Sequence, residues 1–541
     1  MHKKNLLRSN LLSLFMVCSL ISCGGTGDNG GDGKTSGGNG GDNTSDSGTN
    51  TGLDGLADDL TLDDEGNVSF DEQVDIDVWC IIGDPDQKTF ASLVTEFNNE
   101  YQGMIHLNMT YIGHYDYYNN LETAYANDWD SFPEMCIMHN EKTAQYAASG
   151  YLLPLDEINK KTKVEVNYDT VYENIDRVTK YNGVRYAVPM DAHGFVTSIR
   201  QDIIKKNELG FDGNTRFIPN SRKEYQDLLT GLREKADAGE LWIRNINKGA
   251  DHSWTKADPD SFYPEYTQST DPDGLSALYA NGGSMASSDG KTITFQNNEG
   301  FVTYITDQVT RYNNREMGDS AGTNTEGFGT GSYVLFPEGP WWVSQQYTLA
   351  YNNSELKKEG NGVTAEDAAD PIMNTPYTAS RPDGWWTLDE NANTENGSKW
   401  YGNGHAISLT KKITSSQKAA AALTFINWLT HGKDEDTGIY HLATWCNSGH
   451  IPAYKEVYDS EGYQNYMEKN LTLKALGDPA NIIAMEGLGK EVTIFNALAN
   501  AVSLVQGELK TKSGCDKDKA IELINKAASD GQEALDLLDL M

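Results

Sequence analysis

The chain alternates, from residue 73 onward, between short apolar runs and segments with helical spacing. DIDVWCII (75–82) is an apolar, β-branched run that ends at a Gly-Asp-Pro-Asp turn, which is typical of a buried strand. In the segment 86–101, apolar residues recur every three or four positions, as on one face of a helix. The alternation continues with strands at 104–113 and 134–140 and helices at 115–127 and 141–149. Strands separated by helices predict a parallel sheet covered by helices, and hence an α/β fold.

The second half of the chain continues in the same manner, with more helix toward the C-terminus. The segment 184–199 begins as a strand and continues into another after a Pro-Met-Asp-Ala-His-Gly bend. The stretches 246–272 and 352–400 are rich in Asp, Pro, Asn and Gly, which indicates long loops. Further helices are predicted at 222–238, 273–281, 297–315, 339–350, 415–430 and 516–538, and short strands near 241–245, 291–295, 332–336 and 404–409.

The N-terminus differs from the rest of the chain. Three basic residues precede the apolar run 11–21, which is shorter than the about 20 residues that a membrane span needs. A basic head and a short apolar stretch predict a secretory signal peptide over 1–22. Leu-Ile-Ser-Cys at 20–23 resembles a bacterial lipobox, in which the cysteine becomes the first mature residue and carries lipid. Because two or more acyl chains hold a protein durably on a membrane, Cys23 is the predicted anchor.

Residues 23–70 are predicted to form a tether. The stretch behind Cys23 consists of Gly, Asp, Asn, Ser and Thr and cannot bury enough apolar surface to offset its ordering entropy. A Gly-rich coil of this kind spans roughly 35–40 Å on average. The folded body is therefore expected on the extracytoplasmic side, and hydropathy shows no second membrane-spanning segment.

The charge of the chain excludes some partners. Lys and Arg number 43 and Asp and Glu 79, for a net charge of −36, and removing 1–22 takes away three positive charges and no negative one. Such acidity opposes binding to nucleic acid or to anionic headgroups. The body that follows the tether is too long for one hydrophobic core, so two or more lobes are expected.

The sequence predicts no catalytic centre, cofactor or metal. GDSAG (318–322) matches a serine-nucleophile motif but lacks the strand and helix that the motif requires. No CxxC motif or local Cys/His cluster exists, which argues against a structural zinc site. Cys80, Cys136, Cys446 and Cys515 are widely spaced; they could pair outside the cytoplasm or be buried apolar residues.

Aromatic residues are abundant in this acidic chain, with 11 Trp and 28 Tyr, many of them beside polar loops. A flat ring with polar neighbours suits a sugar, whose C–H face packs on the ring while its hydroxyls bond polar side chains.

Seven segments of the body, taken in order, resemble the family-1 extracellular solute-binding proteins of ABC importers, the group that includes maltose-binding protein. They include the block FPEMCIMHNEKTAQYAASGYLLPLDE and the strand and helix YVLFPEGPWWVSQQY. Each segment is degenerate alone, but their order behind a lipobox is specific. The segments are 94–113, 132–157, 181–196, 333–347, 400–412, 419–430 and 448–454.

The resemblance implies two α/β lobes joined by hinge crossings, a type II periplasmic-binding-protein fold. The lobes are predicted at 71–190 plus about 325–400, and at 191–324 plus about 401–541. Ligand in the cleft between the lobes would favour a closed form that the permease recognises. The resemblance also implies a monomer that works with ABC permease subunits.

The resemblance implies ligand contacts at positions that match the family's motifs. Asn140 ends the third strand, where a side chain bonds a sugar hydroxyl, and Asp191 and His193 follow the hinge proline. Asp84 and Asp86 follow the first strand, at the cleft edge of a parallel sheet. The family's glutamate in the hinge region is replaced here, so the same sugar does not carry over. Stacking or lining rings are expected from Trp341, Trp445, Trp342 and Trp385.

The predicted function is therefore a lipid-anchored protein on the outer face of the cell membrane that captures a carbohydrate for an ABC importer. The same fold could instead bind a peptide, a polyamine or glycerol phosphate. A glycan-degrading enzyme with a carboxylate pair, or an adhesive lipoprotein, are the remaining alternatives.

Overall fold

The computed structural model describes residues 53, 55–84, 86–210, 216–266, 271–318, 324–340, 354–380, 385, 387–388, 399–483 and 489–538. The predicted signal peptide and Cys23 lie outside these residues, as does GDSAG from its second residue onward. Residues from Asn50 onward form one compact unit. Within the described part of the chain, no helix combines the length and the apolar character that crossing a membrane requires.

The first sheet has the order β2-β1-β3-β16-β6. Strand β1 runs parallel to β2 and β3, whereas β16 runs antiparallel to both β3 and β6. The predicted alternation of strands and helices in residues 73–149 is confirmed. The strands are β1 (Val74–Cys80), β2 (Ile105–Tyr111), β3 (Met135–His139), β6 (Val188–Pro189) and β16 (His405–Leu409). The helices after β1, β2 and β3 are α1 (Gln87–Glu100), α2 (His114–Asn127), η1 (Asn140–Lys142) and α3 (Thr143–Ala148), and α4 (Leu155–Thr162) follows.

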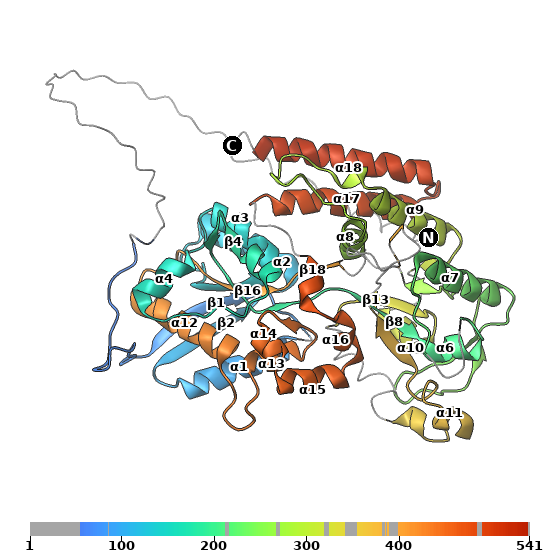
Figure 1. Ribbon diagram of the computed structural model, residues 1–541, viewed down its shortest axis with the longest axis horizontal. Coiled ribbons are helices and arrows are strands. Elements are labelled where there is room, and N and C mark those ends of the chain that lie inside the picture. Colours follow the sequence, from blue (N-terminus) through green and yellow to red (C-terminus); the bar gives the residue numbers. More distant parts are fainter. Residues whose placement is uncertain are drawn as a thin grey trace, which may run out of the picture. The chain divides into compact units, whose positions relative to one another are not determined.

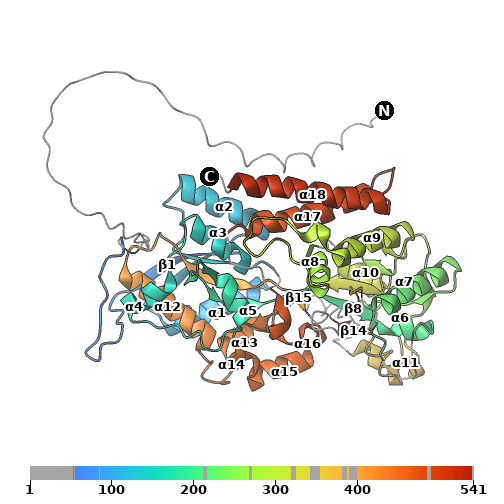
Figure 2. The same ribbon diagram turned by 45° about the horizontal axis from the view of Figure 1, so that its top comes forward.

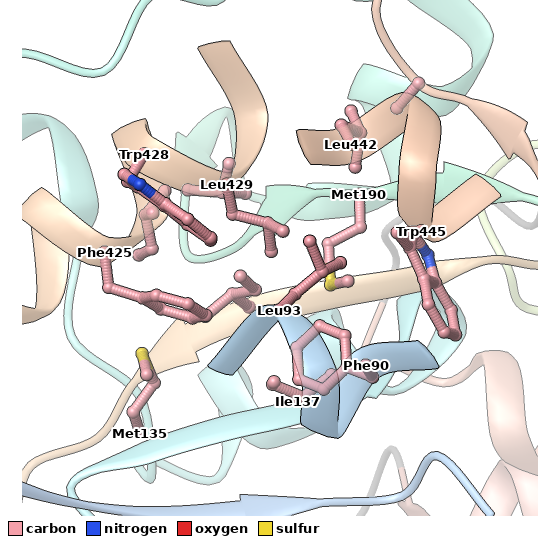
Figure 3. Packing of buried hydrophobic residues seen from close by; sticks show 14 of the residues in the cluster. Phe90, Leu93, Met135, Ile137, Met190, Phe425, Trp428, Leu429, Leu442 and Trp445 are labelled. Atoms are coloured by element: carbon pink, nitrogen blue, oxygen red, sulfur yellow. The ribbon is translucent and has the colours of Figure 1, made fainter. Parts of the chain in front are cut away.

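The core of this sheet is formed with helices from near the other end of the chain (Figure 3). Helix α1 presents Phe90 and Phe97 to α12 (Ser416–His431) and α13 (His441–Cys446). The Phe97 ring lies edge-on to Phe425 at 5.0 Å, and the Phe90 ring lies edge-on to Trp445 at 5.5 Å. Helical spacing of the apolar residues on α1 is what places these rings on one face.

The second sheet has the order β12-β11-β13-β8-β14, in which β8 pairs antiparallel with both β13 and β14. Its strands are β8 (Val196–Arg200), β11 (Glu265–Tyr266), β12 (Met317–Gly318), β13 (Leu335–Glu338) and β14 (Tyr377–Ser380). The helices of this part are α6 (Gln201–Lys206), α7 (Arg222–Asp237), α8 (Asp271–Ala280), α9 (Glu299–Asn313), α10 (Asn324–Thr330) and α11 (Ala365–Ala369).

Two long C-terminal helices, α17 (Glu491–Leu509) and α18 (Lys517–Leu538), lie side by side and contact α9 (Figures 1 and 2). Helix α18 was predicted from its periodic apolar face. Helix α17 was missed because its sequence, VTIFNALANAVSLVQ, is apolar on most sides. A helix packed against α8, α9 and α18 has little polar face to mark its period.

The strand partners differ from the predicted division into lobes. Residues 325–400 were placed with 71–190, but β13 and β14 from that range pair with β8. Residues 401–541 were placed with 191–324, but β16 pairs with β3 and β6 of the first sheet. Apolar runs predict strands but not their partners.

The predicted tether, 23–70, is too long at its C-terminal end. Residues 55–70 pack against the start of α12, where Asp59 accepts hydrogen bonds from Ser415 Oγ (2.6 Å) and Gln417 N (3.1 Å). Leu56 is buried in the core of the first sheet. The apolar residues that begin at Leu53 give this stretch surface to bury, which the preceding Gly-rich residues lack.

The remaining predictions have mixed outcomes. The predicted strand at 291–295 is reduced to a single antiparallel bridge between Ile293 and Ala286, followed by the 3-10 helix Phe295–Asn297. The helix predicted at 339–350 lies almost wholly outside the described residues. Cys80, Cys136, Cys446 and Cys515 are all buried and form no disulfide. This agrees with the prediction that they are buried apolar residues and not with the alternative that they pair. The shorter elements are α5 (Glu173–Asp176), β4 (Lys180–Tyr181), β5 (Val184–Arg185), β7 (Asp191–Ala192), β9 (Trp242–Ile243), β10 (Thr255–Lys256), β15 (Trp400–Tyr401), β17 (Ile451–Pro452), α14 (Lys455–Tyr458), α15 (Glu461–Lys469), α16 (Leu471–Leu476) and β18 (Ile482–Ile483).

Candidate functional site

Five of the ten histidines of the chain gather at the carboxyl end of β3. His139 ends β3, His405 begins β16 and His114 begins α2. His193 follows β7, and His450 precedes β17. Neighbouring ring centroids lie 5.0–5.4 Å apart. We call this group the histidine cluster; its members are His114, His139, His193, His405 and His450.

Strand pairing explains why residues so distant in sequence meet here. In the antiparallel pair of β16 and β3, His405 lies opposite His139. In the antiparallel pair of β17 and β7, Pro452 lies opposite Asp191, which brings the chain on either side of both strands together. The backbone of His193 exchanges hydrogen bonds with Asn403 at 2.8 and 2.9 Å. The ends of β3, β7, β16 and β17 therefore meet at one place.

Gly404 makes this convergence possible. A Cβ atom at this position would lie 2.0 Å from the carbonyl oxygen of Asp191 and 2.8 Å from Asn140 Nδ2. Both contacts are shorter than any carbon can tolerate, so only glycine lets β16 begin this close to β7.

Gly404→Ala is therefore expected to destabilise the protein by about 1–3 kcal/mol, the usual cost of overpacking a well-filled region. Urea unfolding followed by tryptophan fluorescence measures the loss. Gly83→Ala is the matched control, because no atom lies within 4 Å of a Cβ placed there. Equal stability of the two variants would contradict the close approach at Gly404.

Asp191 lies at the centre of the cluster and is fully buried. Its Oδ2 accepts hydrogen bonds from the Trp445 indole (2.6 Å) and lies 3.0 Å from His405 Nδ1, while Oδ1 lies 3.3 Å from His193 Nδ1. Burial alone would raise the pKa of Asp191, but interactions with His405 and His450 and hydrogen bonds from His193 and His405 hold it well below its ordinary value. Asp191 is thus a buried carboxylate held by several donors.

The histidines around Asp191 divide into two kinds. Burial lowers the pKa of His139, His193 and His450 below the ordinary value, so these imidazoles are neutral at pH 7. Burial also acts to lower the pKa of His405, but the adjacent Asp191 carboxylate outweighs it and raises that pKa. Among these imidazoles, His405 is therefore the one whose charged form Asp191 favours.

Asp86 borders the cluster from the start of α1. Its Oδ2 lies 3.9 Å from His450 Nε2. Burial raises the pKa of Asp86 to about 7, with His405 lowering it and Asp191 raising it further. The neighbouring Asp84 is exposed. Of the two predicted carboxylates after β1, Asp86 is thus the one that reaches the cluster.

A row of unpaired oxygens begins where β3 ends. Asn140 is 2% exposed, its backbone N–H donates to Gly404 O at 2.9 Å, and its Oδ1 has no hydrogen-bond partner among the residues that the structure describes. Within the same described part of the chain, three further buried oxygens on η1 and α3 have no partner: Glu141 Oε2, Thr143 Oγ1 and Gln145 Oε1. Unpaired buried polar atoms are costly in folded proteins, and these four lie on one short segment, 140–145.

The predicted tryptophans do not form one platform. Trp445 is fully buried, stacked on His450 with centroids 4.6 Å apart, so it is a wall of the cluster and not an open ring. Trp385 is 1% exposed and stacks on Tyr225 of α7 at 4.7 Å, in the core of the second sheet; it does not join the cluster. Trp341 and Trp342 lie outside the described residues.

Sequence reasoning missed His139, His405 and His450, although each lies in a segment quoted for the resemblance. The signal was a histidine at a strand end, beside a glycine in GNGHAI and SGHIP. Because no two histidines are close in sequence, no ligand set was expected. The fold brings ligating atoms of four buried residues within 4.8 Å of one another: Asp191, His193, His405 and His450. Spacing along the sequence could not reveal a group of this kind.

Residues 92–470 match the family described as bacterial extracellular solute-binding protein. The match covers more than half of the chain, and it includes every residue of the histidine cluster. The chain therefore belongs to the family of bacterial extracellular solute-binding proteins. No curated protein matches the chain significantly by sequence.

Solved structures with low sequence identity share the fold. The GacH receptor of Streptomyces glaucescens, solved unliganded and with acarbose, has 14% identity and a TM-score of 0.60 over 85% of this chain and 99% of its own. The sugar-binding protein MalE of Xanthomonas citri has 15% identity and a TM-score of 0.59 over 86% and 98%. UgpB of Mycobacterium tuberculosis, solved with glycerophosphocholine, has 15% identity and a TM-score of 0.60 over 85% and 99%. These matches confirm the predicted two-lobed α/β fold.

Proposed function

We propose that this chain is the extracytoplasmic solute-binding component of an ABC importer and that it captures an oligosaccharide by closure of its two lobes. The ligand would bind beside the carboxyl end of β3, against Asn140 and the residues that follow it. Family membership supports the solute-binding role. The carbohydrate assignment rests on the local chemistry described next.

The observation that carries this proposal is the row of four unpaired oxygens on η1 and α3. The amide and carboxylate oxygens of Asn140, Glu141 and Gln145 only accept hydrogen bonds, and the Thr143 hydroxyl can accept one, so a ligand rich in donors would satisfy them. The hydroxyls of a sugar do this in any orientation, because each can donate while accepting elsewhere. Of the three structures compared above, one was solved with acarbose and one is of a sugar-binding protein, which agrees with this chemistry.

The same oxygens argue against an anionic ligand. Glycerol phosphate would bring negative charge to a carboxylate-bearing row in a chain of net charge −36. A polyamine is the second candidate, since ammonium groups are pure donors and Glu141 lies within the row. A peptide has fewer donors along one edge and is less well matched.

We also propose that Cys23 carries lipid and that the Gly-rich stretch behind it tethers the body to the outer face of the cell membrane. The lipobox-like Leu-Ile-Ser-Cys at 20–23 supports this anchor. Metabolic labelling with a palmitate analogue tests it: the wild-type chain should become labelled and Cys23→Ala should not. A labelled Cys23→Ala chain would place the lipid elsewhere.

A thermal-shift screen of the full-length chain tests the ligand class. Oligosaccharides, monosaccharides, polyamines, peptides and glycerol phosphate are compared, each well above its expected dissociation constant. A ligand at about 100 times its dissociation constant adds about 2.7 kcal/mol to stability. A rise in the melting temperature with polyamines and none with sugars would replace the carbohydrate assignment with a polyamine. Recovery of a shortened glycan would show an enzyme, and binding of polymer alone would show an adhesin.

Asn140→Ala is expected to weaken binding of the ligand found in this screen by about 10–100-fold, the equivalent of about 1–3 kcal/mol for a buried hydrogen bond. Titration calorimetry measures the change. Asn159→Ala is the control, because Asn159 is also a buried asparagine with an unpaired Oδ1 but lies on α4. Equal affinity in both variants would place the binding site away from β3.

A further inference from the structure

We propose that Asp191, His193, His405 and His450 bind one divalent transition-metal ion of the zinc and cobalt class. The basis is the convergence of three imidazoles on one buried carboxylate, Asp191, in the segment between β6 and β8. This site goes beyond the proposed function, because it stands whether or not the solute is a carbohydrate.

The geometry of the four side chains suits a small ion. Their ligating atoms all lie within 4.8 Å of one another, and the four residues are between 0% and 8% exposed. Zinc bonds of about 2.0–2.1 Å in a tetrahedral site place ligand atoms roughly 3.3 Å apart. Side-chain rotations that draw the atoms together by about 1.5 Å or less would close the site.

The donor set selects the metal. Three imidazole nitrogens and one carboxylate oxygen suit zinc, cobalt, nickel and related ions. Calcium and magnesium prefer six or more oxygen ligands, which this set cannot supply. A site of three histidines and one carboxylate is therefore specific for borderline transition metals.

Outer hydrogen bonds already orient the ligands. The Trp445 indole donates to Asp191 Oδ2 at 2.6 Å, and the His405 backbone N–H donates to Asp191 Oδ1 at 3.1 Å. Ser448 Oγ lies 3.2 Å from His450 Nδ1, which leaves Nε2 to face the ion. Such partners fix the ring orientation of ligating histidines and strengthen metal sites.

The rings also pack closely around the carboxylate. The centroids of His193, His405 and His450 lie 5.0–5.4 Å apart around Asp191. A divalent cation at the centre would be held by the three imidazoles and the carboxylate at once.

The test uses the full-length chain, produced without a polyhistidine tag and stripped with EDTA. Titration calorimetry with Zn²⁺ should give one ion per chain, bound tightly enough to survive desalting. Substitution with Co²⁺ should give the visible absorption bands of a tetrahedral nitrogen- and oxygen-ligated ion. Absence of both signals in the folded wild-type chain would overturn the proposal without recourse to any variant.

Variants separate this site from adventitious binding by histidines. His450→Gln should weaken zinc binding by more than the 10–100-fold that is typical of a lost outer-shell partner, and Trp445→Phe should fall within that range. His114→Gln is the matched control, since His114 belongs to the cluster but not to the ligand set. Circular dichroism confirms that each variant is folded. Zinc affinity that is lowered equally by His114→Gln and His450→Gln would overturn the assignment of the ligands.

The solute screen distinguishes this site from the proposed function. Repeating it with metal-free and zinc-loaded chain shows whether solute binding survives without the ion. Zinc binding without any carbohydrate ligand would leave the metal site and remove the carbohydrate assignment. A carbohydrate ligand without zinc binding would leave the carbohydrate assignment and remove the metal site.

Discussion

Asp202→Asn is expected to destabilise the protein by about 3–5 kcal/mol, the usual cost of removing one partner from a buried ion pair. Asp202 Oδ1 accepts from Arg200 Nε at 2.9 Å, and Oδ2 accepts from Arg200 Nη2 at 3.0 Å and Arg244 Nε at 2.8 Å. The side chains of all three residues are completely buried. The substitution would leave two buried guanidinium groups without a counter-charge.

Asp202 connects several segments, which explains the size of the effect. Arg200, at the end of β8, also donates to the carbonyl of Phe328 at 2.7 Å and to that of Arg244 at 2.9 Å. Arg244 donates to the carbonyl of Met373. The carboxylate thus holds the guanidinium groups that tie β8 to the segments around 244, 328 and 373.

The same substitution should change how the free energy of unfolding depends on pH below neutrality. Burial would raise the pKa of Asp202, but Arg200 and Arg244 outweigh it and lower that pKa below its ordinary value. A carboxyl whose folded-state pKa is lowered contributes stability that is complete above the unfolded pKa of about 3.9. That contribution is lost as the pH falls through the lower, folded-state pKa. The Asp202→Asn variant should therefore be less stable than the wild type at pH 7. Its stability should also fall less than that of the wild type when the pH is lowered.

Urea unfolding between pH 7 and pH 3 measures both effects. Asp227→Asn is the control, because Asp227 pairs with Lys223 on the exposed face of α7, where ion pairs contribute about 0–1 kcal/mol. If the two variants have the same stability, the buried network is not holding the second sheet.

Trp445→Ala is expected to cost about 3–5 kcal/mol, as for other large aromatic side chains removed from a core. The ring is fully buried and lies edge-on to Phe90 of α1 (Figure 3). It also stacks on the imidazole of His450. Its removal would leave a cavity beside the first sheet and would also remove the indole donor to Asp191.

Trp445→Phe separates these two contributions. Phenylalanine keeps most of the packing but cannot donate, and a hydrogen bond to a charged group is worth about 1.5–3 kcal/mol. Chemical unfolding of both variants measures the difference. Trp242→Phe is the control, since Trp242 is 37% exposed and its replacement should change stability by less than about 0.5 kcal/mol. If Trp445→Phe behaves like Trp242→Phe, the indole does not stabilise Asp191.

The sequence by itself determined most of the local structure. Alternating apolar runs located β1, β2 and β3, and helical spacing located α1, α7, α9, α12 and α18, each within a few residues. This works because the period of a strand or a helix is set by the backbone, so a buried face leaves its pattern in the sequence. The order of degenerate segments also indicated the family, which the match over residues 92–470 shows.

Only the tertiary structure decided which strands pair and which side chains meet. An apolar run such as β16 predicts a strand but not that β3 and β6 are its neighbours, because partner choice depends on contacts between residues far apart in sequence. For the same reason, Trp385 and Trp445 could be placed near polar loops but not recognised as buried. The four candidate metal ligands span 191–450 and have no shared spacing. They come together because two antiparallel pairs, β16 with β3 and β17 with β7, end at the same point, where Gly404 leaves room for the backbones to approach.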